Sequence, residues 1–150
     1  MLKAQVLLSM TPNKVRRRTK DPKIYKYFDR IQDFQGKSYR TIYLHTSLHN
    51  DDSSGSNYNL AIRNKGTAAE PSNYLLRPDS QLWVHCSCPY FTFYLEVALT
   101  LQKTSNVYDS NGALPKKLNT GLKPFLCKHL YAALTSLMLT EKTKTKYVPK

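Results

Sequence analysis

Three cysteines and one histidine in the second half of the chain constrain its fold more than any other feature. Cys86 and Cys88 form a Cys-x-Cys pair, and Cys127 and His129 form a Cys-x-His pair about 38 residues later. Three thiolates and one imidazole are a complete ligand set for one tetrahedral Zn²⁺ ion. All three cysteines of the chain belong to this set. The sequence therefore predicts one structural zinc ion held by these four residues.

Each pair requires a different backbone. Alternate residues of a strand point to the same side, so Cys86 and Cys88 can reach one ion from extended chain. Residues two apart on a helix point about 200° apart. We therefore expect Cys127 before a helix and His129 in its first turn. Backbone N–H groups of that turn would point at the sulfurs and favour their thiolate form. The alternative is that the cysteines are ordinary buried thiols.

The residues around these ligands resemble a known family. The run Cys-Ser-Cys-Pro-Tyr-Phe (86–91), the run Pro-Phe-Leu-Cys-Lys-His-Leu (124–130) and the turn at 109–115 are similar to SWIM-type zinc fingers, in particular to small SWIM-like proteins of tailed bacteriophages. The resemblance covers about residues 80–138. The gap of about 38 residues between the two pairs is longer than the Cys-x₂₋₄-Cys spacing usual in structural zinc sites. The segment between the pairs must therefore carry structure of its own.

Length and composition limit the class of protein. A chain of 150 residues suits one domain with one core, and 41% hydrophobic residues are too many for a disordered chain. No apolar run reaches the 18 residues that indicate a membrane span. The apolar part of the first eight residues is too short for a signal peptide, and an odd cysteine count argues against a secreted disulfide framework. We expect a reducing compartment.

The chain is strongly basic, with a net charge of +13. This charge fits either a polyanion such as nucleic acid or acidic neighbours in an assembly, and charge alone does not separate the two. Five cations are clustered near the start and are the predicted binding residues for nucleic acid or a protein partner: Lys14, Arg16, Arg17, Arg18 and Lys20. We expect residues 1–20 to be a basic arm without a core of its own and residues 140–150 to be a Lys-rich tail.

Between these ends, the pattern predicts a single α+β domain over residues 21–139. A helix is expected from Asp21-Pro22 to Phe34, because apolar residues recur at helical spacing; they are Ile24, Tyr27, Phe28 and Ile31, with Phe34 extending the face. Alternation predicts strands at 38–44, 58–63 and 82–88, with a polar hairpin loop at 50–57. Further helices are expected from Pro89 to about Leu101 and from His129 to about Leu139, separated by a long loop at 105–121 that is a candidate docking loop. The prediction is a small antiparallel sheet of about three strands, packed by two or three helices and fastened by zinc.

A zinc ion with four protein ligands has no position open for water, so the pattern predicts a protein that is not an enzyme. His45, His49 and His85 are expected in loop, edge or supporting roles, because four ligands already exist. The resemblance implies a zinc-stabilised structural or adaptor protein of a tailed-phage virion, docking on other virion proteins or packaged DNA, located in the virion or the host cytoplasm. No membrane and no small-molecule substrate are expected as partners. The alternatives are a free nucleic-acid-binding protein, whose binding is led by phosphate contacts, and an enzyme with a composite site between subunits.

Overall fold

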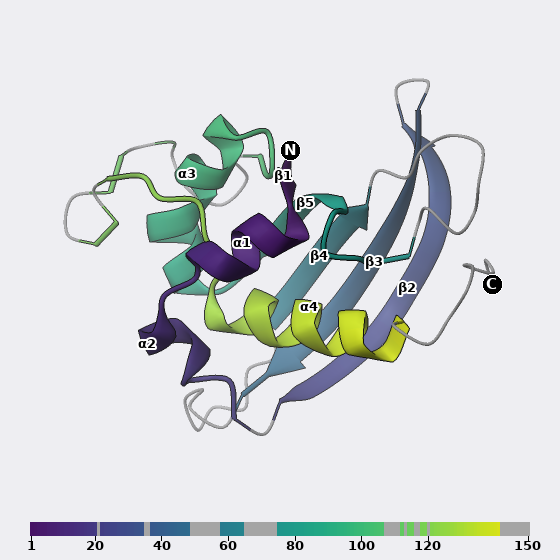
Figure 1. Cartoon of the computed structure of the whole chain (residues 1–150), viewed down its shortest axis with the longest axis horizontal. Helices are drawn as coiled ribbons and strands as arrows, with labels where there is room; N and C mark the ends of the chain where they lie inside the picture. Colours follow the sequence, from purple (N-terminus) through teal and green to yellow (C-terminus); the bar gives the residue numbers. More distant parts are fainter. Residues whose placement is uncertain are drawn as a thin grey trace.

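A computed structural model of the chain describes residues 1–20, 22–34, 37–48, 58–64, 75–106, 112, 114–115, 118–119 and 121–141. Within them the protein is α+β, with one five-stranded antiparallel sheet in the order β1-β5-β4-β3-β2 (Figure 1). The strands are β1 (Leu2–Lys3), β2 (Lys23–Phe34), β3 (Lys37–Ser47), β4 (Tyr58–Asn64) and β5 (Gln81–Cys86). The helices are α1 (Ala4–Met10), α2 (Asn13–Arg16), η2 (Phe91–Leu95), α3 (Glu96–Leu101) and α4 (Lys128–Glu141).

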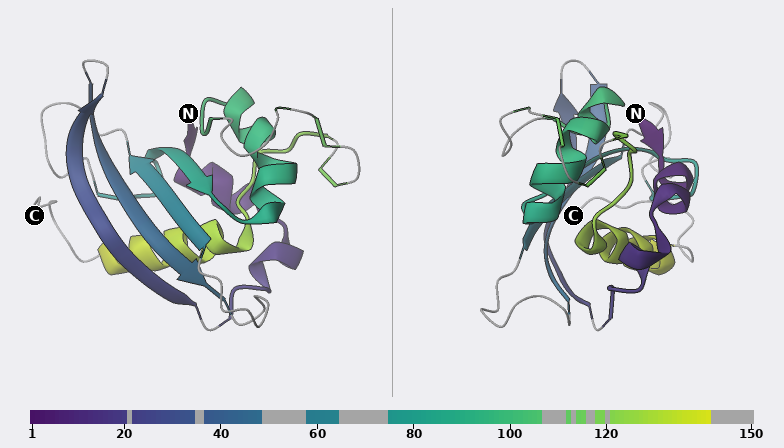
Figure 2. Two further views of the ribbon diagram at one scale, coloured as in Figure 1. Left: turned by 180° about the vertical axis from the view of Figure 1, so that it is seen from behind. Right: turned by 90° about the vertical axis from the view of Figure 1, so that its left-hand side faces the viewer.

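Helix α4 packs against one face of the sheet, and the sheet curves around it (Figures 1 and 2). The core lies between these two layers. It is formed by alternate residues of the inner strands, by one side of α4 and by α1, and its fully buried members include Ile42, Leu44, Leu60, Ile62, Val84, Leu130, Ala133, Leu134, Ala4 and Leu7. Period-two alternation in the strands and helical spacing in α4 thus direct two apolar surfaces at each other. In the described part of the chain, no helix has the length and apolar character needed to cross a membrane.

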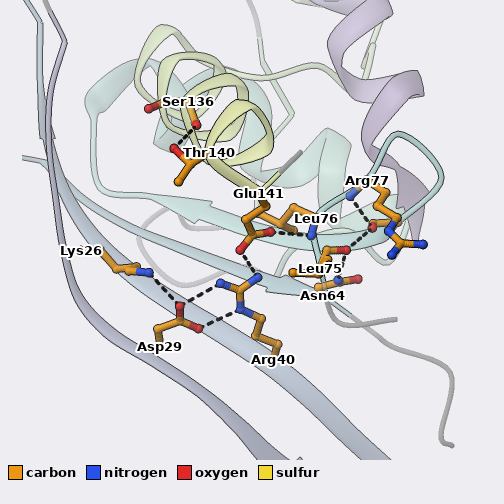
Figure 3. A network of polar contacts seen from close by, with 11 residues as sticks. Lys26, Asp29, Arg40, Asn64, Leu75, Leu76, Arg77, Ser136, Thr140 and Glu141 are labelled. Atoms are coloured by element: carbon orange, nitrogen blue, oxygen red, sulfur yellow. Dashed lines mark hydrogen bonds and ion pairs between the residues drawn. The ribbon is translucent and has the colours of Figure 1, made fainter. Parts of the chain in front are cut away.

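The far end of α4 is fastened to the sheet by a buried cluster of charges (Figure 3). Arg40 of β3 is fully buried, and its guanidinium donates two hydrogen bonds of 2.8 Å to the carboxylate of Asp29 on β2. The same guanidinium forms an ion pair with Glu141 in the last turn of α4. Glu141 also accepts a hydrogen bond of 2.7 Å from the backbone N–H of Leu76. Arg40 and Glu141 together therefore join β2, β3, the end of α4 and the segment before β5.

The expected helix from Asp21-Pro22 to Phe34 is wrong, because Lys23–Phe34 is the edge strand β2. A β-bulge between Lys26 and Phe28 explains the spacing of Ile24 and Ile31, although Phe28 faces the other side of the sheet. In an unbroken strand, Ile24 and Ile31 lie an odd number of residues apart and face opposite sides. The extra residue returns Ile31 to the side of Ile24, and the spacing of seven then looks helical.

The expectation that residues 1–20 form an arm without a core of its own is wrong. β1 pairs with β5 at Leu2↔Leu82, and Ala4 and Leu7 of α1 are fully buried in the main core. The short apolar run that the sequence shows near the start is thus a part of the fold. Only the second half of the predicted arm is largely exposed, around α2.

The remaining expectations agree with the structure more closely. The three predicted strands correspond to β3, β4 and β5, and the two helices predicted after Cys88 correspond to η2 with α3 and to α4. The sheet has five strands where about three were expected, because β1 and β2 were not foreseen. Helix α4 also continues to Glu141, into the expected tail. The loop at 50–57, most of the loop at 105–121 and residues 142–150 lie outside the described residues.

Candidate metal centre

The first ligand pair lies where β5 ends. Cys86 is the last residue of β5, where it is paired with Leu60 of β4, and Cys88 follows two residues later. Both side chains are buried. The strand directs Cys86 to the α4 side of the sheet and His85 to the opposite side, as the alternation predicts. His85 is contacted there by Glu96, with 3.8 Å between Nδ1 and Oε2, and by the edge of the Phe91 ring.

The second pair lies where α4 begins. Cys127 immediately precedes the helix, and His129 is its second residue. Both are buried, and the ring of His129 packs against the ring of Tyr58 with 4.5 Å between centroids. The helix thus starts between the two ligands, which confirms the geometry expected for a Cys-x-His pair. Leu130, Ala133 and Leu134 continue the buried side of the helix and hold it against the sheet.

The fold brings these two pairs to one place. The ligand atoms of Cys86, Cys88, Cys127 and His129 all lie within 4.8 Å of one another. A tetrahedral ion with metal–sulfur bonds of about 2.3 Å separates its sulfur ligands by about 3.8 Å. The four atoms therefore surround a space into which one metal ion fits. The three cysteines form no disulfide.

Backbone N–H groups point at each of the three sulfurs. Cys88 N donates to Cys86 Sγ at 3.5 Å, Phe91 N donates to Cys88 Sγ at 3.4 Å, and Leu130 N donates to Cys127 Sγ at 3.5 Å. Hydrogen bonds of this kind stabilise thiolates and fix the direction of metal-ligating sulfurs. They come from the strand end, from η2 and from α4, so three elements orient the ligands.

The protonation of the thiols shows what the site requires. Burial raises the pKa of Cys86 and of Cys127 well above the ordinary value. Hydrogen bonds from Cys127 and Cys86 hold the pKa of Cys88 well below its usual range, and nearby His129 lowers it further. In a buried cluster, one negative charge is tolerated and two further charges are not, unless a cation compensates them. A bound metal ion is such a cation, so the donor set fits a metal.

The segment that leads to Cys127 is held by the start of the chain. The buried hydroxyl of Thr11 donates to the carbonyl of Leu7 at 2.7 Å and accepts a hydrogen bond of 3.1 Å from the N–H of Leu126. Leu126 immediately precedes the third ligand. A residue 115 positions away in the sequence therefore positions the second ligand pair. Nothing in the local pattern around Thr11 indicated this role.

The structure places the five cations predicted to bind a partner in two different settings. Arg16 turns back on the end of α1, where its guanidinium donates to the carbonyls of Leu8, Ser9 and Thr11 at 2.6–3.1 Å, and it lies over the ring of Tyr131. Its role in the structure is to cap α1. Lys14, Arg17, Arg18 and Lys20 are exposed.

Two of these exposed cations line a groove beside the metal centre. The groove has a volume of about 410 Å³, and its walls include the cations Lys14, Arg18 and Lys128 and the rings of Tyr58 and Tyr90. Cys88 and His129 also border it, and among the described residues none that lines it is acidic. Lys128 and Tyr58 were not among the residues singled out from the sequence, although Lys128 stands between two predicted ligands.

Comparison of the chain with protein-family models, with curated proteins and with solved structures gave no match. The similarity to SWIM-type fingers therefore rests on the motif residues alone. What the structure establishes is a buried Cys-x-Cys…Cys-x-His cluster, compatible with a zinc finger, that can hold one metal ion.

Proposed function

We propose that the protein is a zinc-stabilised structural or adaptor protein without enzymatic activity. The observation that carries this proposal is the convergence of Cys86, Cys88, Cys127 and His129 within 4.8 Å, all buried. Three sulfurs and one imidazole favour zinc among the common divalent ions, since soft thiolates select against magnesium and calcium. The ion would join the end of β5 to the start of α4.

The binding free energy of a structural zinc ion is comparable with the free energy of unfolding of a whole domain. Structural zinc contributes an apparent binding free energy of about 10–16 kcal/mol in small peptides at neutral pH. Folded domains are stable by only about 5–15 kcal/mol. The ion would therefore decide whether α4 stays on the sheet. Removal of zinc by a chelator from the purified protein tests this role, and unfolding should accompany metal loss.

The donor set also argues against catalysis at this ion. A catalytic zinc ion usually has three protein ligands and an exchangeable water, whereas this cluster offers four protein donors. Three thiolates leave the ion with a net charge near −1, which makes it a poor Lewis acid. We propose that the ion serves the fold alone.

The resemblance to SWIM-like phage proteins supports a setting in a tailed-phage particle, where the protein would dock on neighbouring subunits or packaged DNA. The basic surface around Lys14, Arg17 and Arg18 suits either neighbour, since acidic protein and phosphate attract the same cations. Mass spectrometry of washed particles tests this setting. The protein should be present at a constant ratio to the other virion proteins, and its absence from washed particles would exclude the proposal.

A second candidate function is nucleic-acid binding led by phosphate contacts, and the groove beside the metal centre favours it. Lys14, Arg18 and Lys128 converge there, and the lining residues that the structure describes include no carboxylate. Each phosphate that a protein cation neutralises releases counterions and steepens the dependence of affinity on salt. A Lys14→Gln/Arg18→Gln variant should bind DNA more weakly and with a smaller salt slope. An unchanged dependence of affinity on salt would show that these two cations of the groove do not contact phosphate.

A further inference from the structure

The sheet has an outer face, opposite α4, that carries a group of aromatic side chains. Along β3, Arg40, Ile42 and Leu44 point towards α4, so the residues between them point outward. The register places outward partners beside them, at Tyr25↔His45, Phe28↔Tyr43 and Arg63↔Thr41. We call this surface the aromatic face; its residues are Tyr25, Tyr27, Phe28, Arg30, Tyr39, Tyr43, His45 and Arg63.

The rings of the aromatic face are arranged in contact with one another and are open to solvent. The ring of His45 stacks on that of Tyr27 with 4.4 Å between centroids and lies parallel to that of Tyr25 at 6.3 Å. Tyr43 contacts both Tyr27 and Phe28. Tyr25 is 65% exposed and Tyr27 is 48% exposed. The bulge in β2 is what places Tyr27 and Phe28 side by side on this face.

Cations lie among these rings. The guanidinium of Arg30 lies over the ring of Phe28 at 5.5 Å, and that of Arg63 lies between the rings of Tyr39 and Trp83, at 5.9 and 4.8 Å. Of the outward side chains that the structure describes on β2, β3 and β4, none is a carboxylate. Figure 2 shows no helix over the part of this face formed by β2 and β3. The surface is thus aromatic and positive.

We propose that the aromatic face binds single-stranded nucleic acid, with bases stacked on Tyr25 and Tyr27 and phosphates neutralised by Arg30 and neighbouring cations. Every base has a flat aromatic surface, so exposed rings bind unpaired strands with little dependence on sequence. Paired bases are stacked on each other and are not accessible to rings that project from a sheet. This role goes beyond the structural role of the metal ion, and its failure would leave that role intact.

Fluorescence anisotropy of the metal-loaded full chain with labelled oligo(dT), oligo(U) and a DNA duplex tests the proposal at fixed salt. We expect tighter binding to the single strands than to the duplex. The Tyr25→Ala/Tyr27→Ala variant should lose at least about tenfold in affinity for the single strands, because each stacked base contributes strongly to binding. Tyr25→Phe/Tyr27→Phe keeps the rings and should bind like the unchanged protein.

Phe93→Ala is the matched control, since Phe93 is 63% exposed but belongs to η2 and not to the aromatic face. It should bind single strands like the unchanged protein. Metal content and circular dichroism equal to those of the unchanged protein show that each variant is folded. The groove beside the metal centre shares no residue with the aromatic face, so its variants separate the two surfaces.

Three results would overturn the proposal: no binding of single strands by the unchanged protein, equal or tighter binding of the duplex, or full affinity in the folded Tyr25→Ala/Tyr27→Ala variant. Light scattering is measured in parallel. A dimer that disappears in the same variant, without any oligonucleotide binding, would assign the face to a second copy of this chain instead.

Discussion

Cys88 lies at the centre of the ligand cluster, because its sulfur receives hydrogen bonds from Phe91 N and from both other thiols. We predict that Cys88→Ser loses the bound metal and most of the soluble folded protein, since a serine hydroxyl does not replace a thiolate as a ligand. Elemental analysis and circular dichroism measure the two effects. Ser87→Ala is the control, because Ser87 is exposed between two ligands and should leave the metal content unchanged. A Cys88→Ser protein with one equivalent of metal and an unchanged melting point would contradict the assignment.

Metal affinity should fall as the pH falls. Burial raises the pKa of Cys86 and of Cys127 well above the ordinary value, so both thiols carry protons at neutral pH in the absence of metal. Both must lose their protons when the metal binds, and protons therefore compete with it. At about pH 7 to 8, the logarithm of the binding constant should rise by at least two for each pH unit, because at least two protons are released. Competition with a chromophoric chelator at several pH values measures the slope, and a slope of zero would contradict it.

Arg40 compensates two carboxylates that lie at the far end of α4 (Figure 3). Burial by itself lowers the pKa of this arginine, but its hydrogen bond with Asp29 and the charge of Glu141 outweigh burial and raise it. A negative residue at a helix C-terminus is unfavourable by itself, so Glu141 depends on this partner.

We predict that Arg40→Leu lowers the free energy of unfolding by about 3–5 kcal/mol, because it removes the buried cation that pairs with both Glu141 and Asp29. Lys26→Gln is the matched control. Lys26 also pairs with Asp29, but its side chain is 32% exposed, so the loss should stay below about 1 kcal/mol. Urea unfolding of the metal-loaded protein measures both values. Equal losses in the two variants would show that burial of the arginine does not matter.

At the scale of elements, the connection between α1 and the start of α4 depends on the hydroxyl of Thr11. We predict that Thr11→Val destabilises the protein by about 1–3 kcal/mol, because the buried N–H of Leu126 then has no acceptor there. Thr11→Ser retains the hydroxyl and should retain most of the stability. Thermal unfolding with and without chelator compares the two variants. A Thr11→Val protein as stable as the Thr11→Ser protein would show that this contact does not hold α4.

Strand β2 shows where a sequence pattern is ambiguous. Its residues include Ile24, Tyr25, Tyr27, Phe28 and Ile31, and such β-branched and aromatic residues are enriched in strands. That composition was the available signal for a strand, but the bulge puts Ile24 and Ile31 on one face at a spacing of seven, which also fits a helix. The same bulge turns Tyr27 and Phe28 to one face and so creates the surface proposed to bind single strands.

For the whole molecule, the sequence predicted the elements whose pattern is local and missed those that depend on distant contacts. The ligand set, the position of His129 in the first turn of α4 and the three strands from 38 to 88 follow from spacing alone. The position of β1 beside β5, the burial of Leu7 and the contact from Thr11 to Leu126 join residues that are far apart in sequence. The sequence also did not show that Arg16 turns back on α1. The carbonyl groups that accept its hydrogen bonds come near it only in the folded chain.

The metal content and ligand environment of the purified protein test the central claim most directly. Elemental analysis should find one zinc ion per chain, and X-ray absorption should find three sulfur neighbours at about 2.3 Å and one nitrogen at about 2.0–2.1 Å. Chelation should then unfold the protein, because the ion joins β5 to α4. A protein that contains no stoichiometric metal, or one that keeps its melting temperature after chelation, would contradict the claim.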